Sequence, residues 1–200
     1  MIGKRVYQIL FVVVRAAMFF WHPVFRVYGR ENVPSEGALL ICPNHSGLAD
    51  PIWVIFAVRP KTMPRFMAKK EVMDVPVLGR FLTWLGGFGV DRSGADVRAV
   101  KNGLKCLRDG RQLMLFPEGT RVKAGKIVKA KGGAVLLSHR TNTPILPVYL
   151  SPRKGLFCPI TCVIGAPVMP TFSTDRPREE EILSQAELIM QKTYQLRTEI

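Results

Sequence analysis

The sequence predicts an α/β fold: a single layered domain of alternating strands and helices, preceded by an apolar helix at the N-terminus. A chain of 200 residues is long enough for one domain with a sizeable core. Hydrophobic residues make up 48% of it and charged residues 22%, a balance typical of a folded chain. After Pro23, short apolar runs alternate with helical patterns, which indicates helices layered on a sheet.

The N-terminal segment, MIGKRVYQILFVVVRAAMFFWH, predicts a helix that is apolar nearly all round. A spanning helix needs about 20 predominantly apolar residues, and Arg15 near the centre of this run would cost roughly 2.5–3.5 kcal/mol on insertion. The pattern therefore favours a helix that lies in the membrane interface, with Arg15 snorkelling and Trp21 near the headgroups. A helix buried against the domain is the alternative, because length and periodicity do not separate the two cases.

We divide the chain into a membrane-associated N-terminal helix, residues 1–22, and one domain, residues 23–200. Within the domain, the strand at 144–150 contains Pro147, which predicts a bend or a sheet edge at that position. The expected strands cover residues 24–28, 38–42, 65–69, 112–116, 144–150 and 160–164. The expected helices cover residues 51–58, 76–85, 93–108, 131–140 and 178–197.

Two of these helices have distinct end signals. In the helix at 93–108, Ser93 can cap the first turn, and apolar residues three or four positions apart form one stripe. The last helix, 178–197, begins after Pro177 with three glutamates in its first turn, which the helix dipole favours. Its inward-facing positions are Ile182, Ala186, Ile189 and Tyr194.

The formal net charge of +14 is concentrated in the middle of the chain. Residues 61–140 have 17 Lys and Arg against 6 Asp and Glu, a net charge of +11, whereas residues 141–200 have equal numbers of both signs. One basic face predicts an anionic partner: nucleic acid, anionic lipid or a phosphorylated substrate. A solvated surface is the alternative.

The four cysteines have no CxxC spacing, which indicates reduced thiols in a cytosol-facing protein.

Polar side chains gather where the predicted strands end, the edge at which α/β sheets bind ligands. His45 and Asp50 follow the strand at 38–42, in the segment CPNHSGLADP. A carboxylate bonded to one imidazole nitrogen fixes the tautomer and raises the basicity of the other, which would make His45 a general base. Alone the pattern is weak, because a single histidine in a turn is more often a structural group.

Three further segments supply groups that bind anions. GGFGVDRS, residues 86–93, places Arg92 just before a helix N-terminus, a combination that favours an anion; a capped turn with a surface Asp–Arg pair is the alternative. In QLMLFPEGTR, Arg121 would bind a phosphate bidentately, while Glu118 orients it or accepts from a substrate hydroxyl. Residues 122–134 extend the basic surface with Lys123, Lys126, Lys129 and Lys131.

Four segments, NHSGLAD, GGFGVDR, FPEGTR and PILPVYL, appear in the order of the motifs of the glycerolipid acyltransferases. The chain resembles this family over residues 24–165, and within it the bacterial 1-acylglycerol-3-phosphate acyltransferases that make phosphatidic acid. FPEGTR is a complete and specific match. One position departs from the family pattern: Gly47 stands where a serine is frequent, so we expect Ser46 or Asn44 to hold the loop.

The resemblance implies that His45 and Asp50 form a catalytic dyad. His45 would deprotonate the free hydroxyl of a lysolipid, whose oxygen then attacks an acyl thioester without a covalent acyl-enzyme. No metal and no cofactor are expected, and acyl-CoA or acyl carrier protein would be the co-substrate. The resemblance also assigns substrate binding to Arg92, Glu118, Gly119, Thr120, Arg121 and Pro147.

These observations predict the partners and the location of the protein. The partners are lysophospholipid and acyl thioester substrates and an anionic membrane surface, with acyl carrier protein as a further candidate and no nucleic acid. The expected location is the cytoplasmic face of the cell membrane. A different acceptor is one alternative: lyso-ornithine lipid, another lysophospholipid or a lipid A precursor.

Two other classes of function fit the sequence less well. A basic module that binds membranes or nucleic acid without catalysis would leave His45, Asp50 and Glu118 without roles, and no RNA-binding or helix-turn-helix signature is present. A metal hydrolase is disfavoured because the histidines, His22, His45 and His139, have no HxH or HExxH spacing.

Overall fold

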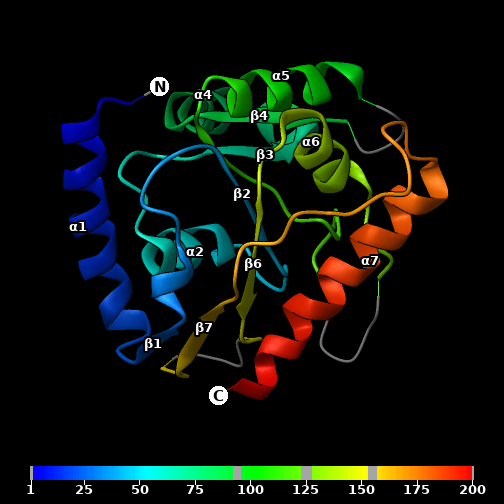
Figure 1. The fold of residues 1–200 in the computed structure, drawn as a ribbon. Coiled ribbons are helices and arrows are strands. Elements are labelled where there is room, and N and C mark those ends of the chain that lie inside the picture. Colours follow the sequence, from blue (N-terminus) through cyan, green and yellow to red (C-terminus); the bar gives the residue numbers. More distant parts are fainter. Residues whose placement is uncertain (1, 92–95, 123–127, 153–156, 200) are drawn as a thin grey trace.

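The structure is a computed structural model that describes residues 2–91, 96–122, 128–152 and 157–199. It confirms the predicted α/β fold, with one sheet between two layers of helices (Figure 1). The strands are β1 (Phe25–Tyr28), β2 (Leu39–Pro43), β3 (Arg65–Lys69), β4 (Gly87–Val90), β5 (Gln112–Met114), β6 (Ile145–Leu150) and β7 (Ile160–Ile164). The helices are α1 (Lys4–Trp21), α2 (Asp50–Val58), α3 (Lys70–Met73), α4 (Pro76–Leu85), α5 (Val97–Arg108), α6 (Gly133–Thr141) and α7 (Glu179–Gln195).

Most elements lie close to their predicted positions, and two are additional. Neither β4 nor α3 was predicted from the sequence. Two of the four residues of β4 are glycines, which have low strand propensity, and α3 is a single turn, too short for a periodic pattern. The pairing of β4 with β3 supplies the backbone hydrogen bonds that its own side chains do not predict.

The strand order in the sheet is β1-β7-β6-β2-β5-β3-β4. All neighbouring strands are parallel except β6 and β7, which are antiparallel. The central strands β2, β5 and β6 therefore end at the same edge of the sheet, and the segments that follow them meet there.

Each face of the sheet has its own hydrophobic core. Leu39 and Ile41 of β2 pack with α2 and α1, whereas Leu40 and Cys42 pack with α5, α6 and α7. Trp53 of α2 is fully buried, and complete burial of a large apolar side chain stabilises a fold by about 1.5–3 kcal/mol. The loops at the strand ends therefore start from a rigid frame. None of the four cysteines forms a disulfide.

Helix α5 begins later than predicted, at Val97. The expected cap, Ser93, lies outside the described residues, and Asp96 caps the helix instead. Its Oδ1 accepts from the N–H of Ala99 at 2.9 Å and its Oδ2 from the N–H of Asp91 at 2.8 Å. The backbone N–H of Asp91, and after it that of Ala99, lowers the pKa of Asp96. The first turn of α5 thus has a carboxylate from the chain itself.

Pro147 is not at a sheet edge, so that part of its prediction is wrong. Strand β6 lies between β2 and β7, and Pro147 pairs with Cys42. Its carbonyl accepts from the N–H of Gly165 at 3.0 Å, one residue after β7 ends. A strand residue directs its carbonyl and its N–H to the same side, here toward β7. The N–H that proline lacks would therefore face the end of the β6–β7 pairing, where one missing hydrogen bond weakens the sheet least.

Helix α1 packs one face on the domain and exposes the other. Tyr7 is buried, and Phe11, Val14 and Met18 pack against the core on the α2 face. The guanidinium of Arg15 lies 5.6 Å from the ring centroid of Phe25 and 5.8 Å from that of Phe56, so it contacts aromatic rings of the domain. The exposed apolar residues of α1 are Val6, Ile9, Val12, Val13, Phe19, Phe20 and Trp21.

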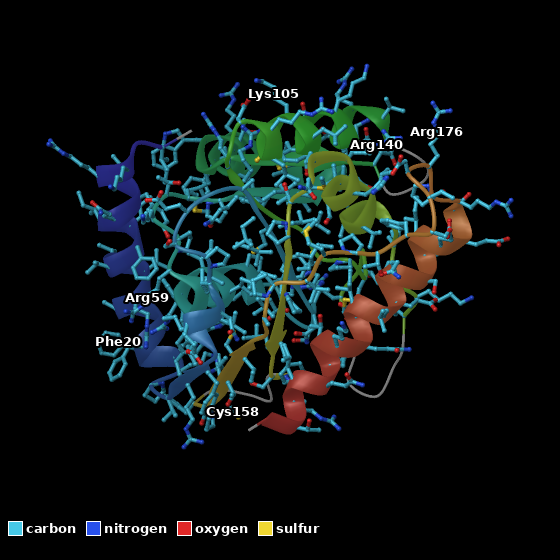
Figure 2. The ribbon with its side chains drawn as sticks, in the orientation of Figure 1. Phe20, Arg59, Lys105, Arg140, Cys158 and Arg176 are labelled. Carbon is cyan, nitrogen blue, oxygen red and sulfur yellow. The ribbon has the colours of Figure 1, made fainter. Side chains whose placement is uncertain are left out.

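The packed face of α1 fits the alternative of a helix against the domain, and its location in a membrane interface stays a prediction. Figure 2 shows Phe20 pointing away from the domain. Within the described parts of the chain, no helix combines the length and the apolar character needed to cross a membrane.

Candidate active site

The loop between β2 and α2 brings His45 and Asp50 into contact. The distance between His45 Nδ1 and Asp50 Oδ2 is 3.0 Å. Asp50 is the first residue of α2 and is completely buried, whereas 15% of the His45 side chain is exposed. The carboxylate is thus inside the protein and the imidazole reaches its surface.

Backbone donors hold the Asp50 carboxylate in place. Oδ2 accepts from the N–H of Ser46 and from the N–H of Gly47, each at 2.6 Å, and the Ser46 hydroxyl lies 3.5 Å away. Charge-assisted bonds of this kind are about twice as strong as neutral ones. Gly47 therefore contributes its backbone N–H to the loop, and the Ser46 hydroxyl lies near the same carboxylate oxygen.

The contact with Asp50 sets the orientation of the imidazole. A carboxylate at Nδ1 favours a proton on that nitrogen and leaves the lone pair of neutral His45 on Nε2. None of the hydrogen bonds between described residues involves Nε2. The ring stacks on Phe116, with ring centroids 4.1 Å apart and an angle of 27° between the planes. His45 thus presents a hydrogen-bond acceptor at a fixed position.

Glu118 links three segments of the chain. Its Oε2 accepts from the N–H of His45 at 2.7 Å, and its Oε1 accepts from the hydroxyl of Tyr194 in α7. Only 2% of Glu118 is exposed, and burial raises its pKa, while the hydrogen bonds from Tyr194 and His45 oppose that rise. The Glu118 carboxylate thus positions the backbone of His45.

Two further backbone bonds dock the FPEGTR loop. The carbonyl of His45 accepts from the N–H of Val122 at 2.8 Å, and the carbonyl of Pro117 accepts from the N–H of Lys131 at 2.8 Å. Gly119 has a φ of +67°, and a β-carbon there would lie 2.9 Å from Cε of Lys131. The left-handed backbone conformation favours glycine at this point, whereas the flexible end of the Lys131 side chain could move to make room.

The remaining predicted substrate-binding residues have different environments. Thr120 and Arg121 are exposed beside Gly119, where they are accessible to a ligand. Arg92 lies outside the described residues. Pro147 is buried in β6, so the structure does not bring its side chain to the surface.

An apolar cavity of about 510 Å³ lies beside the FPEGTR loop. It shares Phe116, the stacking partner of His45, and Gly119 with the site. Pockets of this kind, apolar with a few polar groups, are typical ligand sites. Other apolar lining residues include Met67, Val90, Val100, Leu115, Leu136, Leu137, Ile182 and Leu183.

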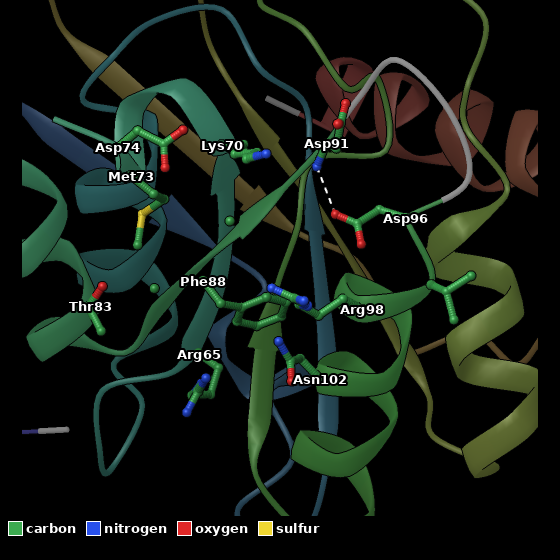
Figure 3. A pocket seen from close by; sticks show the side chains of 13 residues that line it. Arg65, Lys70, Met73, Asp74, Thr83, Phe88, Asp91, Asp96, Arg98 and Asn102 are labelled. Carbon is green, nitrogen blue, oxygen red and sulfur yellow. Dashed lines mark hydrogen bonds between the residues drawn. The ribbon is translucent and has the colours of Figure 1, made fainter.

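A second, more polar cavity of about 870 Å³ runs beside the edge strand β4. Figure 3 shows Arg98 and Asn102 of α5 on one side of it and Lys70, Met73 and Asp74 on the other. It shares Asp91 and Asp96 with the apolar cavity, so the two meet at the start of α5. Cations and carboxylates are mixed here, so this cavity is not a purely basic anion site.

The other histidines have structural contacts. His22 is buried, and its Nδ1 lies 3.0 Å from the carbonyl of Cys158. His139 Nε2 lies 3.1 Å from the carbonyl of Asp175. No group of three or more His, Cys, Asp or Glu side chains in the described ranges has the arrangement of a metal site.

Comparison with known proteins identifies the family. A family model described as Acyltransferase matches residues 24–151, more than half of the chain. The chain belongs to the acyltransferase family. The 1-acyl-sn-glycerol-3-phosphate acyltransferase of Bacillus subtilis is 29% identical to it over 180 residues, which cover 88% of this acyltransferase and 89% of the relative. A relative of the same name from Borreliella burgdorferi is 31% identical over 137 residues, covering 66% and 52% of the two chains.

A solved structure extends the similarity to the fold. The crystal structure of the 1-acyl-sn-glycerophosphate acyltransferase PlsC from Thermotoga maritima matches this acyltransferase with a TM-score of 0.71 and 25% identity. The match covers 97% of this chain and 79% of that chain. The likeness therefore includes the described helices at both ends, outside the family model.

Sequence reasoning missed two contacts of the site. Tyr194 was expected only to face inward, and it lies outside the residues that the family model matches. No local motif connects it with Glu118, from which it is 76 positions distant. Asn44 was proposed as a loop holder, but its amide instead bridges strand ends: it donates to the carbonyl of Leu150 at 3.0 Å and accepts from its N–H at 2.7 Å.

Proposed function

We propose that this acyltransferase transfers a fatty acyl group from a thioester to the free hydroxyl of 1-acylglycerol 3-phosphate, giving phosphatidic acid. The observation that best supports this is the His45–Asp50 contact, which directs the Nε2 lone pair away from the carboxylate. The names of the relatives from Bacillus subtilis and Borreliella burgdorferi support the same acceptor.

In the proposed reaction, Nε2 of His45 takes the proton of the acceptor hydroxyl. The oxygen attacks the thioester carbonyl carbon, the new C–O bond forms, and the C–S bond breaks. The thiolate that leaves takes the proton back from the imidazolium, so the enzyme ends unchanged. Asp50 stabilises the imidazolium in between, because its charge lies 3.0 Å from Nδ1.

Charges and apolar surfaces near the site suit the two ends of such a lipid acceptor. Arg121, two residues after Gly119, and Lys131, whose side chain approaches Gly119, are exposed cations. Arg92 is the third proposed phosphate ligand, with Glu118, Gly119 and Thr120 shaping the same loop. The apolar cavity that Phe116 helps to line would take an acyl chain. Pro147 would act only indirectly, by shaping β6.

The other proposed features concern the donor and the location. We propose acyl-CoA or acyl carrier protein as the donor and no cofactor, since the proton transfers need only His45 and Asp50. The exposed apolar face of α1 would lie in the interface of an anionic membrane, at its cytoplasmic face.

The direct test is product identification. The purified protein, incubated with 1-acylglycerol 3-phosphate and either acyl-CoA or acyl carrier protein loaded with an acyl group, should yield phosphatidic acid by mass spectrometry. Turnover of lyso-ornithine lipid but not of 1-acylglycerol 3-phosphate would reject the acceptor. Failure with every acceptor and both donors would reject the enzymatic function.

Tyr194 is proposed as a positioning residue, and its removal should change the pH dependence of the reaction. Its hydroxyl donates to Glu118 and helps to lower a pKa that burial raises. In Tyr194→Phe this contact is lost, so the pKa of Glu118 rises further and the acid limb of kcat/KM moves to higher pH. We expect a loss of about tenfold near neutral pH, the effect of one charge-assisted hydrogen bond.

The matched control is Tyr149→Phe, because the Tyr149 ring packs against that of Tyr194 with centroids 6.3 Å apart. This variant should leave the acid limb unchanged. A Tyr194→Phe protein with a lower melting temperature but an unshifted pH profile would show that Tyr194 is merely structural.

A further inference from the structure

Helix α4 exposes an apolar face that nothing in the described chain covers. The exposed fractions are 82% for Val77, 43% for Leu78, 49% for Phe81 and 43% for Trp84. Except for the adjacent pair Val77 and Leu78, successive positions are three or four residues apart, so all four lie on one side of the helix. A ten-residue helix with four large apolar side chains in solvent is unusual for a surface that faces only water.

The other side of α4 is pressed tightly against the domain. Gly79 is the buried residue of the helix, and a β-carbon there would lie 1.8 Å from the carbonyl oxygen of Met73. Pro76 begins the helix, and Gly86, with a φ of +108°, ends it. The helix therefore cannot turn its apolar face inward without losing this close contact.

The end of α4 lies beside the start of α1. The N–H of Ile2, just before α1, donates to the carbonyl of Trp84 at 3.1 Å. Figure 1 shows the N-terminus beside α4, with α1 running down the adjacent side of the molecule. The exposed residues of α1 nearest this junction in the sequence are Val6 and Ile9.

The charges on the two helices themselves suit an anionic layer, although Glu71 and Asp74 are exposed just before α4. Neither α1 nor α4 contains an acidic residue, whereas Lys4, Arg5 and Arg80 are exposed on them. Helix α7 on the opposite side of the molecule is different, since it has three glutamates in its first turn. Apolar side chains flanked by cations are the pattern of helices that lie on anionic bilayers.

We infer that α4 is a second membrane-contacting element, which with α1 forms one surface that lies on an anionic bilayer. Val77, Leu78, Phe81 and Trp84 enter the interface, and Lys4, Arg5 and Arg80 lie at headgroup level. Two helices joined at one end fix the tilt of the domain on the membrane, which a single helix does not. The inference rests on the proposed function in that both place the enzyme on lipid.

Vesicle binding tests this surface. The whole protein is mixed with vesicles of phosphatidylglycerol and phosphatidylethanolamine, and the bound fraction is measured by sedimentation. Val77→Ser/Phe81→Ser should weaken binding by about tenfold, because each change removes apolar area from the interface. The control is Val97→Ser/Leu188→Ser, which changes side chains that are 62% and 43% exposed on α5 and α7 and should bind like the unchanged protein.

Tryptophan fluorescence gives a second, independent measurement. Trp21→Phe leaves the buried Trp53 and the exposed Trp84 as the fluorophores. Brominated lipids should quench Trp21→Phe, and the quenching should disappear in Trp21→Phe/Trp84→Phe. Equal quenching of these two proteins would overturn the inference.

Two other outcomes would also overturn it. Equal vesicle binding by Val77→Ser/Phe81→Ser and by the unchanged protein would contradict the insertion of α4. If light scattering finds the unchanged protein dimeric and this variant monomeric, a second copy covers the face instead. A separate assay distinguishes this inference from the proposed function. If the protein does not acylate 1-acylglycerol 3-phosphate in detergent micelles, the proposed function is wrong. The role of α4 is decided by vesicle binding alone.

Discussion

Replacing His45 with alanine should lower the rate of acyl transfer by on the order of 10²–10⁴-fold, the usual contribution of a general base. The imidazole is the group that would accept the substrate proton, and none of the hydrogen bonds between described residues uses its Nε2. The loop should remain folded, because its backbone contacts with Glu118 and Val122 do not involve the imidazole. Steady-state rates and thermal unfolding of the same preparation measure the two effects.

The matched control for this change is His139→Ala. His139 lies in α6 and contacts the carbonyl of Asp175, away from the β2–α2 loop. Its replacement should leave the rate within about twofold, as for most changes outside the site. Full activity in His45→Ala would disprove the role of the dyad, whereas equal losses in both variants would show that the assay reports stability.

Asp50→Asn should reduce activity by on the order of 10³–10⁴-fold, the effect of the corresponding change in Ser-His-Asp triads. Asparagine has nearly the same shape, but it has no negative charge to stabilise the imidazolium. Its amide also brings donors toward a site where Ser46, Gly47 and His45 already supply three. One donor must then lose its acceptor or the ring must change its tautomer.

A separate cost in stability is expected for Asp50→Asn. Leaving a buried donor unsatisfied costs about 1–3 kcal/mol, so urea unfolding should show a decrease of that size. Asp109→Asn is the control: Asp109 pairs with Lys105 at the surface and should affect neither measurement. If Asp50→Asn keeps its rate but loses stability, Asp50 holds the loop without taking part in catalysis.

The sequence predicts most of the frame because β2, β6 and β7 are short apolar runs bounded by turn residues. Their burial is uniform, so the run itself identifies them. Strand β4 cannot be recognised as an apolar run, because its conformation depends on pairing with β3 rather than on its own side chains. The first residue of α5 was also not predictable from the sequence, because Ser93 and Asp96 are both residue types that cap helices well. Only the structure shows that Asp96 is the cap.

In the candidate site, contacts between residues close in the sequence were predictable, and contacts between distant residues were not. The contact between His45 and Asp50 is local, since a turn of five residues and a helix start join them, and it can be read from NHSGLAD. The partners of Glu118 come from two distant segments, and no spacing rule connects them. Arg15 shows the same limit: its isolated pattern indicates a membrane interface, whereas its contacts with Phe25 and Phe56 arise only on folding.

The contact between Tyr194 and Glu118 has a consequence for the order in which the enzyme matures. The two residues are 76 positions apart, and Tyr194 is the later of them in the sequence. During synthesis from the N-terminus, the loop that holds His45 is complete long before Tyr194 leaves the ribosome. The nascent chain therefore lacks the support that α7 gives to Glu118, and the enzyme acquires it only when α7 docks.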